Sequence, residues 1–195
     1  MNMTPKERAD LRYELLCAVA ITGDLAKIEE CIERGVDANL EDMSNEEAMF
    51  AFVEQDWERV STDDEFGLFV HIMNEGTLIS LAIEHSTSTP QTLQLIDLLL
   101  SHGADVTDPA NMKAALACSS IEFIKWLLSH GAVITPALVI YAFHCSTVQL
   151  LQYLYQEIGI RLSRHDRAQV LSIVRQRDDF HETYEMYEKF SRRVK

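Results

Sequence analysis

The sequence has few of the residues that break, cross-link or anchor a chain. Seven Gly and four Pro among 195 residues are too few for a low-complexity or collagen-like protein. The four Cys lack paired spacing, which excludes a disulfide framework and favours reduced thiols. No run of about 18 apolar residues is present, and the N-terminus lacks the apolar core of a secretory signal. We therefore expect a soluble, cytoplasmic protein with no role at a membrane.

Motifs for catalysis and metal binding are also missing. The sequence contains no Gly-rich phosphate loop, no His-Glu-x-x-His and no Cys-x-x-Cys. The pair His144 and Cys145 suggests a phosphatase-type cysteine, but that chemistry requires an Arg six residues after the Cys, where Leu151 stands. We expect a protein that is not an enzyme and that needs no cofactor and no metal.

An internal repeat is the main feature that is present. The run Leu-Leu-Ser-His-Gly-Ala at residues 99–104 returns at residues 127–132. Self-similarity at a period of roughly 20 to 50 residues is typical of stacked-repeat proteins. Each run ends at a Gly, Gly103 or Gly131, where a residue with positive φ is expected to stop a helix. The predicted unit is a short helix, a turn, a Leu-rich helix and a Gly turn.

This unit resembles the ankyrin repeat. The best match is residues 15–39, which look like one whole helix pair ending in Gly-Val-Asp-Ala-Asn. Residues 77–82 stand where the family usually has Thr-Pro-Leu-His-Leu-Ala, although Leu78 replaces the Pro and Ser80 the His. The resemblance implies an all-α fold, an ankyrin-like solenoid of stacked helix-turn-helix repeats with capping helices, and binding of other proteins as the function.

We expect one domain over residues 1–195. Residues 1–39 form an N-terminal cap and first repeat, residues 77–159 form repeats, and residues 160–195 form C-terminal capping helices. Residues 40–76 are either an acidic insertion or a degenerate repeat. The expected helices cover residues 5–22, 25–34, 45–57, 78–84, 93–100, 110–118, 121–128, 136–145, 148–158, 166–176 and 180–194. Residues 57–72 fit a second helix or a β-hairpin equally well.

Three smaller expectations concern single side chains. His102 and His130 precede the helix-ending Gly residues, where an imidazole can bond the last carbonyl groups of a helix. Trp126 lies in a Leu-rich helix and is expected in the core. On the last helix, Phe180, Tyr184, Tyr187 and Phe190 are expected to form one apolar stripe.

The charge of the chain is unevenly distributed. The formal net charge is −14, and ten acidic residues but only one base, Arg59, occur between residues 41 and 65. Beyond Gly159 the balance reverses, with nine Lys and Arg against six Asp and Glu. Such a layout steers association with charged partners and disfavours nucleic acid at the acidic part. A solvated loop without a partner is the alternative interpretation of the acidic stretch.

The acidic stretch and its two flanking aromatic residues are the candidate partner-binding site. Trp is enriched at protein interfaces, although Trp57 and Phe66 fit equally well as residues packed under the insertion. The candidate residues are Asp42, Glu46, Glu47, Glu54, Asp56, Trp57, Glu58, Asp63, Asp64, Glu65 and Phe66.

The sequence thus predicts a monomeric module that binds another protein with a basic surface and then masks or scaffolds it. The alternative is an acidic inhibitor or immunity protein of a basic enzyme, such as a nuclease or toxin, or a secreted bacterial effector. That alternative rests on small ankyrin-like proteins with such functions.

Overall fold

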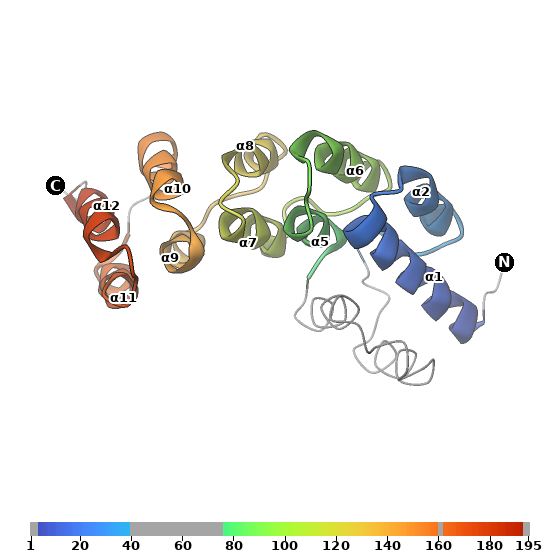
Figure 1. Ribbon diagram of the computed structural model, residues 1–195, viewed down its shortest axis with the longest axis horizontal. Helices are drawn as coiled ribbons and strands as arrows, with labels where there is room; N and C mark the ends of the chain where they lie inside the picture. Colours follow the sequence, from blue (N-terminus) through green and yellow to red (C-terminus); the bar gives the residue numbers. More distant parts are fainter. Residues whose placement is uncertain (1–3, 40–75, 160–161, 193–195) are drawn as a thin grey trace. The chain divides into compact units, whose positions relative to one another are not determined.

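The computed structural model describes residues 4–39, 76–159 and 162–192 (Figure 1). Within these ranges the regular structure is entirely helical, with ten α-helices and no strand. The expected helix at residues 45–57 and the two alternatives for residues 57–72 lie outside the described residues. Nowhere in the described ranges is a helix both long and apolar enough to cross a membrane. The chain divides into two compact units, Met1–Asn111 and Met112–Lys195, which we describe separately.

Unit 1 begins with a long helix whose start is fixed by its first residues. Helix α1 (Pro5–Cys17) continues into the π-helical segment η1 (Ala18–Thr22). The Thr4 hydroxyl accepts a hydrogen bond from the Glu7 amide, and the Glu7 carboxylate accepts one from the Thr4 amide. This reciprocal pair satisfies two amides that a helix start leaves unpaired. The predicted helix over residues 5–22 is therefore confirmed.

The other described helices of unit 1 form pairs that contact one another. Helix α2 (Leu25–Glu33) packs on α1, and helix α5 (Leu78–Glu84) packs on α6 (Thr89–Ser101). The two pairs touch directly, because η1 contacts α5 and α2 contacts α6. Helix α7 (Pro109–Ala117) begins at the end of the unit.

Unit 2 contains the later helix pairs. They are α8 (Ile121–Ser129), α9 (Pro136–Cys145), α10 (Val148–Tyr153) with the π-helical segment η2 (Leu154–Ile158), α11 (Arg164–Val174) and α12 (Phe180–Arg192). Helix α11 packs on both α9 and α12, and α12 packs on α10 and η2. Each of these helices buries an apolar face, such as Val170 and Val174 on α11. Removing that apolar surface from water is the main stabilising term of the fold.

A Gly turn with nearly constant geometry follows α2, α6 and α8. The φ angles of Gly35, Gly103 and Gly131 are 104°, 92° and 101°, which residues with a Cβ rarely adopt. After each Gly the next amide donates to a carbonyl in the last turn of the helix, from Ala104 to Leu99 at 3.1 Å and from Ala132 to Leu127 at 3.0 Å. The predicted helix stops at Gly103 and Gly131 are confirmed.

The structure corrects two expectations about individual segments. Helix α6 starts at Thr89 rather than at residue 93, so the connection after α5 comprises only residues 85–88. Pro90 lies in the first turn of α6, where its missing amide hydrogen costs nothing. The expected core position of Trp126 is wrong, because this residue is only half-buried.

The ring of Trp126 stacks on the imidazole of His130, with the ring centroids 3.8 Å apart. His130 also contacts the Trp126 carbonyl oxygen through Nδ1 at 2.8 Å. The prediction that His130 bonds a carbonyl at the end of its helix is therefore confirmed, and His102 occupies the equivalent end of α6.

On α12 the expected apolar stripe is confirmed in part, because its four residues are not buried equally. Thr183, Met186 and Phe190 form the buried face, and Phe190 packs edge-on against Phe143 of α9. The other three aromatic residues of the expected stripe are half-buried, and they form a separate row in which neighbouring rings are 5.5 Å and 5.8 Å apart. Because a helix advances about 100° per residue, residue 190 points about 80° away from residue 180.

Candidate functional site

The predicted partner-binding residues, from Asp42 to Phe66, all fall within residues 40–75 and so lie outside the described residues. The structure does describe the chain on both sides of that range. Asn39 precedes it, and Gly76 and Thr77 follow it. The contacts of these flanking residues show how the described chain is held on either side of residues 40–75.

Asn39 is held by the Gly turn that follows α6. Its Nδ2 donates to the Gly103 carbonyl oxygen at 2.9 Å, and its Oδ1 accepts from the Asp105 amide at 2.6 Å. A side-chain amide that pairs with a backbone C=O and a backbone N–H uses both of its polar ends. The chain just before the acidic stretch is thus fixed to residues 103–105.

Asn111 also holds this turn. This residue is 0% exposed, and its Nδ2 donates to the carbonyl oxygens of Asp105 at 2.9 Å and Val106 at 3.2 Å. Its Oδ1 accepts from the Thr77 hydroxyl at 2.5 Å. The chain just after the acidic stretch is therefore tied, through Asn111, to the turn that holds Asn39. We call this set of hydrogen bonds the anchor (Asn39, Thr77, Asp105 and Asn111).

Local bonds stiffen the anchor at both Thr77 and Asp105. Thr77 begins α5, and its hydroxyl accepts from the Ser80 amide while the Ser80 hydroxyl accepts from the Thr77 amide. Ser80 thus closes the start of the helix where the family motif has a His. The Asp105 carboxylate accepts from the Thr107 hydroxyl and amide at 2.7 Å and 2.8 Å, which lowers the pKa of Asp105.

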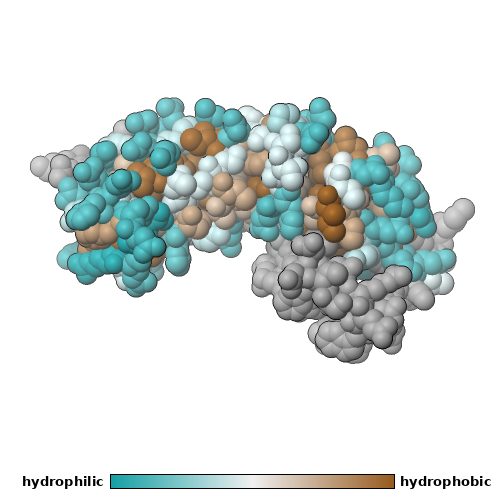
Figure 2. Space-filling view, viewed as in Figure 1, coloured by the Kyte–Doolittle hydropathy of each residue, from teal (hydrophilic) through white to brown (hydrophobic). Residues whose placement is uncertain are grey.

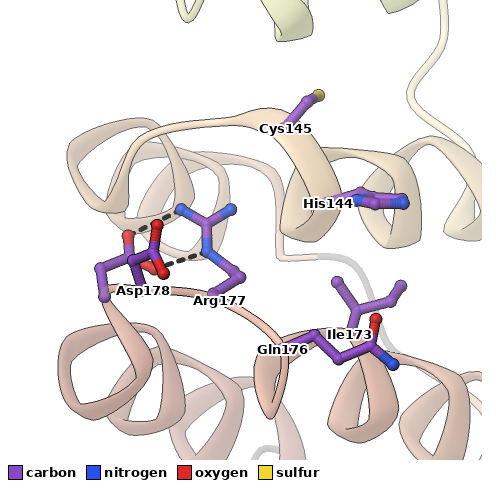
Figure 3. A pocket seen from close by; sticks show the side chains of 7 residues that line it. His144, Cys145, Ile173, Gln176, Arg177 and Asp178 are labelled. Carbon is purple, nitrogen blue, oxygen red and sulfur yellow. Dashed lines mark hydrogen bonds and ion pairs between the residues drawn. The ribbon is translucent and has the colours of Figure 1, made fainter.

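Unit 2 contains a separate polar pocket of about 550 Å³ between the end of α9 and the α11–α12 turn (Figure 3). His144, Cys145, Ile173, Gln176, Arg177, Asp178 and Asp179 line it. Arg177 uses four of its five donors within the protein. Nε and Nη2 bond the two carboxylate oxygens of Asp179 at 2.6 Å and 2.7 Å, and Nη1 and Nη2 bond the carbonyl oxygens of Phe143 and Ser146 at 2.9 Å and 3.0 Å.

Asp179 is the electrostatic partner that holds this arrangement together. The Arg177 guanidinium, and to a smaller extent the Thr183 hydroxyl at 2.8 Å, lower the pKa of Asp179 to about 2. The same pair raises the pKa of Arg177. Both groups are therefore charged and paired at neutral pH, and Arg177 caps the carbonyl end of α9.

The other pocket residues do not form a nucleophile site. Partial burial raises the pKa of Cys145, so the thiol form is favoured over the thiolate that attacks substrates. Its Sγ donates to the Tyr141 carbonyl oxygen at 3.3 Å. Figure 3 shows the Cys145 side chain directed away from that of His144. The geometry describes a structural joint between α9 and the terminal helix pair.

Sequence reasoning identified neither Asn111 nor Arg177 as important. Asn111 was distinguished in the sequence only as a polar residue in an Ala-rich segment. Nothing in the sequence distinguished Arg177 from the other Lys and Arg residues beyond Gly159, which number nine with it. Among the residues that the structure describes, no group of three or more His, Cys, Asp or Glu side chains is placed to hold a metal ion. The chain matches no family model, no curated protein and no solved structure.

Proposed function

We propose that this chain is a protein-binding module built on an ankyrin-like stack, which occupies the surface of a basic partner and performs no catalysis. The observation that carries the proposal is the anchor. It ties the described residues on either side of residues 40–75 to one turn of unit 1, through Asn39 before that range and Thr77 after it. Fixing two points of a chain segment reduces the entropy that binding must remove.

The helix packing of unit 1 supports a stack of helix pairs. The pair α1–α2 contacts the pair α5–α6 directly, and Asn39 bonds the turn after α6. The Gly turns of constant geometry after α2, α6 and α8 support the ankyrin-like assignment.

The distribution of charge supports a basic protein as the partner. Unit 1 contains 23 Asp and Glu against six Lys and Arg, a formal net charge of −17. Such a charge density repels itself, and a cationic partner relieves that repulsion. The attraction acts mainly on the association rate, and it weakens as salt screens the charges. The fold gives no reason to expect nucleic acid as the partner of unit 1.

The concentration of acidic charge in unit 1 also favours the second candidate function, inhibition of a basic enzyme. A compact acidic chain can cover the substrate-binding surface of a nuclease or toxin. Pull-down from the source cell, read by mass spectrometry, separates the two candidates. One stoichiometric basic enzyme that loses activity on binding indicates inhibition, whereas several unrelated partners indicate a scaffold.

Charge reversal in the acidic stretch tests both versions of the proposal with the purified partner. We expect Asp63→Lys, Asp64→Lys and Glu65→Lys together to slow association at least about tenfold, and the wild-type rate to fall as salt is raised. The matched control reverses three exposed carboxylates elsewhere, at Glu29, Glu33 and Glu185. The proposal fails if the control slows association as much as the test variant, or if neither variant changes the association rate. The acidic stretch would then be a solvated segment without a partner.

A further inference from the structure

Unit 2 has the opposite charge from unit 1. It contains eleven Lys and Arg against eight Asp and Glu, a formal net charge of +3 in a chain whose total is −14. Hydrophilic residues cover most of the α11 and α12 surface on the face drawn in Figure 2. The net charge of unit 2 is thus opposite in sign to that of the acidic stretch.

Three arginines, Arg164, Arg167 and Arg175, lie along one side of α11, and we call them the arginine ridge. At about 100° and 1.5 Å per residue, Arg164 and Arg175 point within about 20° of each other and are about 16 Å apart. Arg167 is offset by about 60°. Arg164 and Arg175 are exposed, and Arg167 is half-buried, with its Nε donating to the Ser163 carbonyl oxygen.

None of the three arginines has a carboxylate within ion-pair distance among the described residues. Three other cations of the described residues do have a carboxylate partner, among them Lys27 with Glu14 at 2.7 Å and Arg177 with Asp179 at 2.6 Å. Asp166 is the one carboxylate on α11, and it is committed to the helix start, where it accepts from the Ser163 amide at 2.9 Å.

The position of Arg164 is unfavourable for the isolated chain. It is the first residue of α11, at the positive end of the helix dipole, where a cation is destabilising. A carboxylate from a partner would interact favourably with Arg164 and with the helix dipole together. The energetics of the ridge therefore point to an anionic ligand.

The surface between the arginines points to a polypeptide. Ala168 and the half-buried Leu171 lie between Arg164 and Arg175, so shorter, apolar side chains separate the two charged ends of the ridge. Affinity for a nucleic acid comes largely from many Lys and Arg contacts to its phosphates, whereas the ridge supplies three cations. An acidic helix with an apolar residue between its carboxylates fits the ridge better than a nucleic acid does.

We propose that the arginine ridge of α11 is a second docking surface, which binds an acidic amphipathic helix of a partner protein. The chain would then hold partners of opposite charge on its two units. This surface does not depend on the acidic stretch, so either proposal can fail without the other.

A synthetic peptide tests the ridge in the full-length protein. The probe is a fluorescein-labelled helical peptide with Glu spaced to meet both ends of the ridge and Leu between them, followed by anisotropy at low salt. A peptide with Gln in place of Glu is its control. We expect Arg164→Glu with Arg175→Glu to weaken binding at least about tenfold, because attraction becomes repulsion at both ends.

Matched controls separate the ridge from general charge. Lys113→Glu with Lys189→Glu makes the same charge change at exposed positions of unit 2, and we expect it to weaken binding less than about twofold. If the ridge variant unfolds by circular dichroism, Arg164→Gln with Arg175→Gln replaces it. The proposal is overturned if the Glu peptide does not bind, if the two charge reversals act equally, if the Gln peptide binds as well, or if an oligothymidine binds more tightly than the Glu peptide.

Discussion

Replacement of Arg177 by Met tests whether the joint in unit 2 stabilises the fold. The Arg177 side chain is 16% exposed, and the change removes two hydrogen bonds to Asp179 and two to the carbonyl end of α9. Breaking a fully buried pair costs about 3 to 5 kcal/mol. Because the adjacent pocket admits water to the groups left behind, we expect a loss of about 2 to 4 kcal/mol in the free energy of unfolding.

Urea unfolding followed by Trp fluorescence measures this loss, and hydrogen exchange in α12 shows where it acts. Arg175→Met is the control, because Arg175 is exposed two residues away and has no carboxylate partner among the described residues. We expect the control to change stability by less than about 0.5 kcal/mol. Equal stabilities of the two variants, or unchanged exchange in α12, would falsify the role assigned to Arg177.

The pH dependence gives the same test a second readout. A carboxyl group whose pKa is lower in the folded than in the unfolded state stabilises the fold above its unfolded pKa. For Asp179 that contribution is lost as the pH falls from its ordinary value of 3.8 to about 2. The shift corresponds to about 2.5 kcal/mol, which we reduce to about 1 kcal/mol because the carboxylate is 35% exposed and water screens it. The stability difference between wild type and Asp179→Asn should be constant above pH 5 and shrink by this amount in acid.

Three further predictions concern the anchor, the core and the thiols. Asn111→Ala should destabilise unit 1 by about 2 kcal/mol, because it removes the hydrogen bonds of a fully buried side chain to two part-buried carbonyl oxygens and to the Thr77 hydroxyl, and a change below about 0.5 kcal/mol in urea would show that the anchor is not needed for stability. Leu127→Ala should cost about 3 to 5 kcal/mol and Trp126→Ala only about 2 kcal/mol, because Leu127 is fully buried and the indole is not; the reverse order would contradict the structure. A thiol reagent should modify exposed Cys118 in the native protein but buried Cys31 only after unfolding, as peptide mass mapping can establish.

The helices were predictable because the signals that start and stop them are local. Thr4 and Glu7 close a capping box within four residues. Gly103 and Gly131 end their helices because each adopts a positive φ angle, which glycine reaches without steric strain. Helix α9 has the predicted bounds of residues 136–145, with Pro136 at its start. The start of α6 was missed because the Ser and Thr residues before Pro90 look like a loop, and a first-turn Pro gives the same signal as a loop Pro.

Burial was harder to predict than helix formation. Trp126 follows the apolar pattern of α8, yet its ring lies at the edge of the core and stacks on His130. The periodicity of one helix gives the apolar side but not how far a neighbour covers it. On α12 the aromatic residues were expected to form the apolar face. Thr183 and Met186 are buried beside Phe190, whereas the other three aromatic residues are only half-buried.

The contacts of the candidate site were even harder to predict from the sequence than burial was. The acidic stretch was found from composition, whereas the anchor depends on contacts of Thr77 with Asn111 and of Asn39 with Asp105, between residues 34 and 66 positions apart. Nothing local distinguishes these residues from ordinary polar positions. Their importance arises only when the helix pair before the acidic stretch packs on the pair after it, which brings Asn39 to the turn at Asp105.

The two units carry opposite net charges, which become visible only when charges are counted separately on either side of the unit boundary. A net charge of −14 suggests a uniformly acidic protein, but the boundary after Asn111 separates −17 from +3. Screening at physiological salt acts over about 8 Å, so a surface on one unit is governed mainly by the charges near it. A basic partner at the acidic stretch and an acidic partner at the arginine ridge are therefore compatible in one chain. Raising the salt should weaken both interactions, while each charge reversal should weaken only its own.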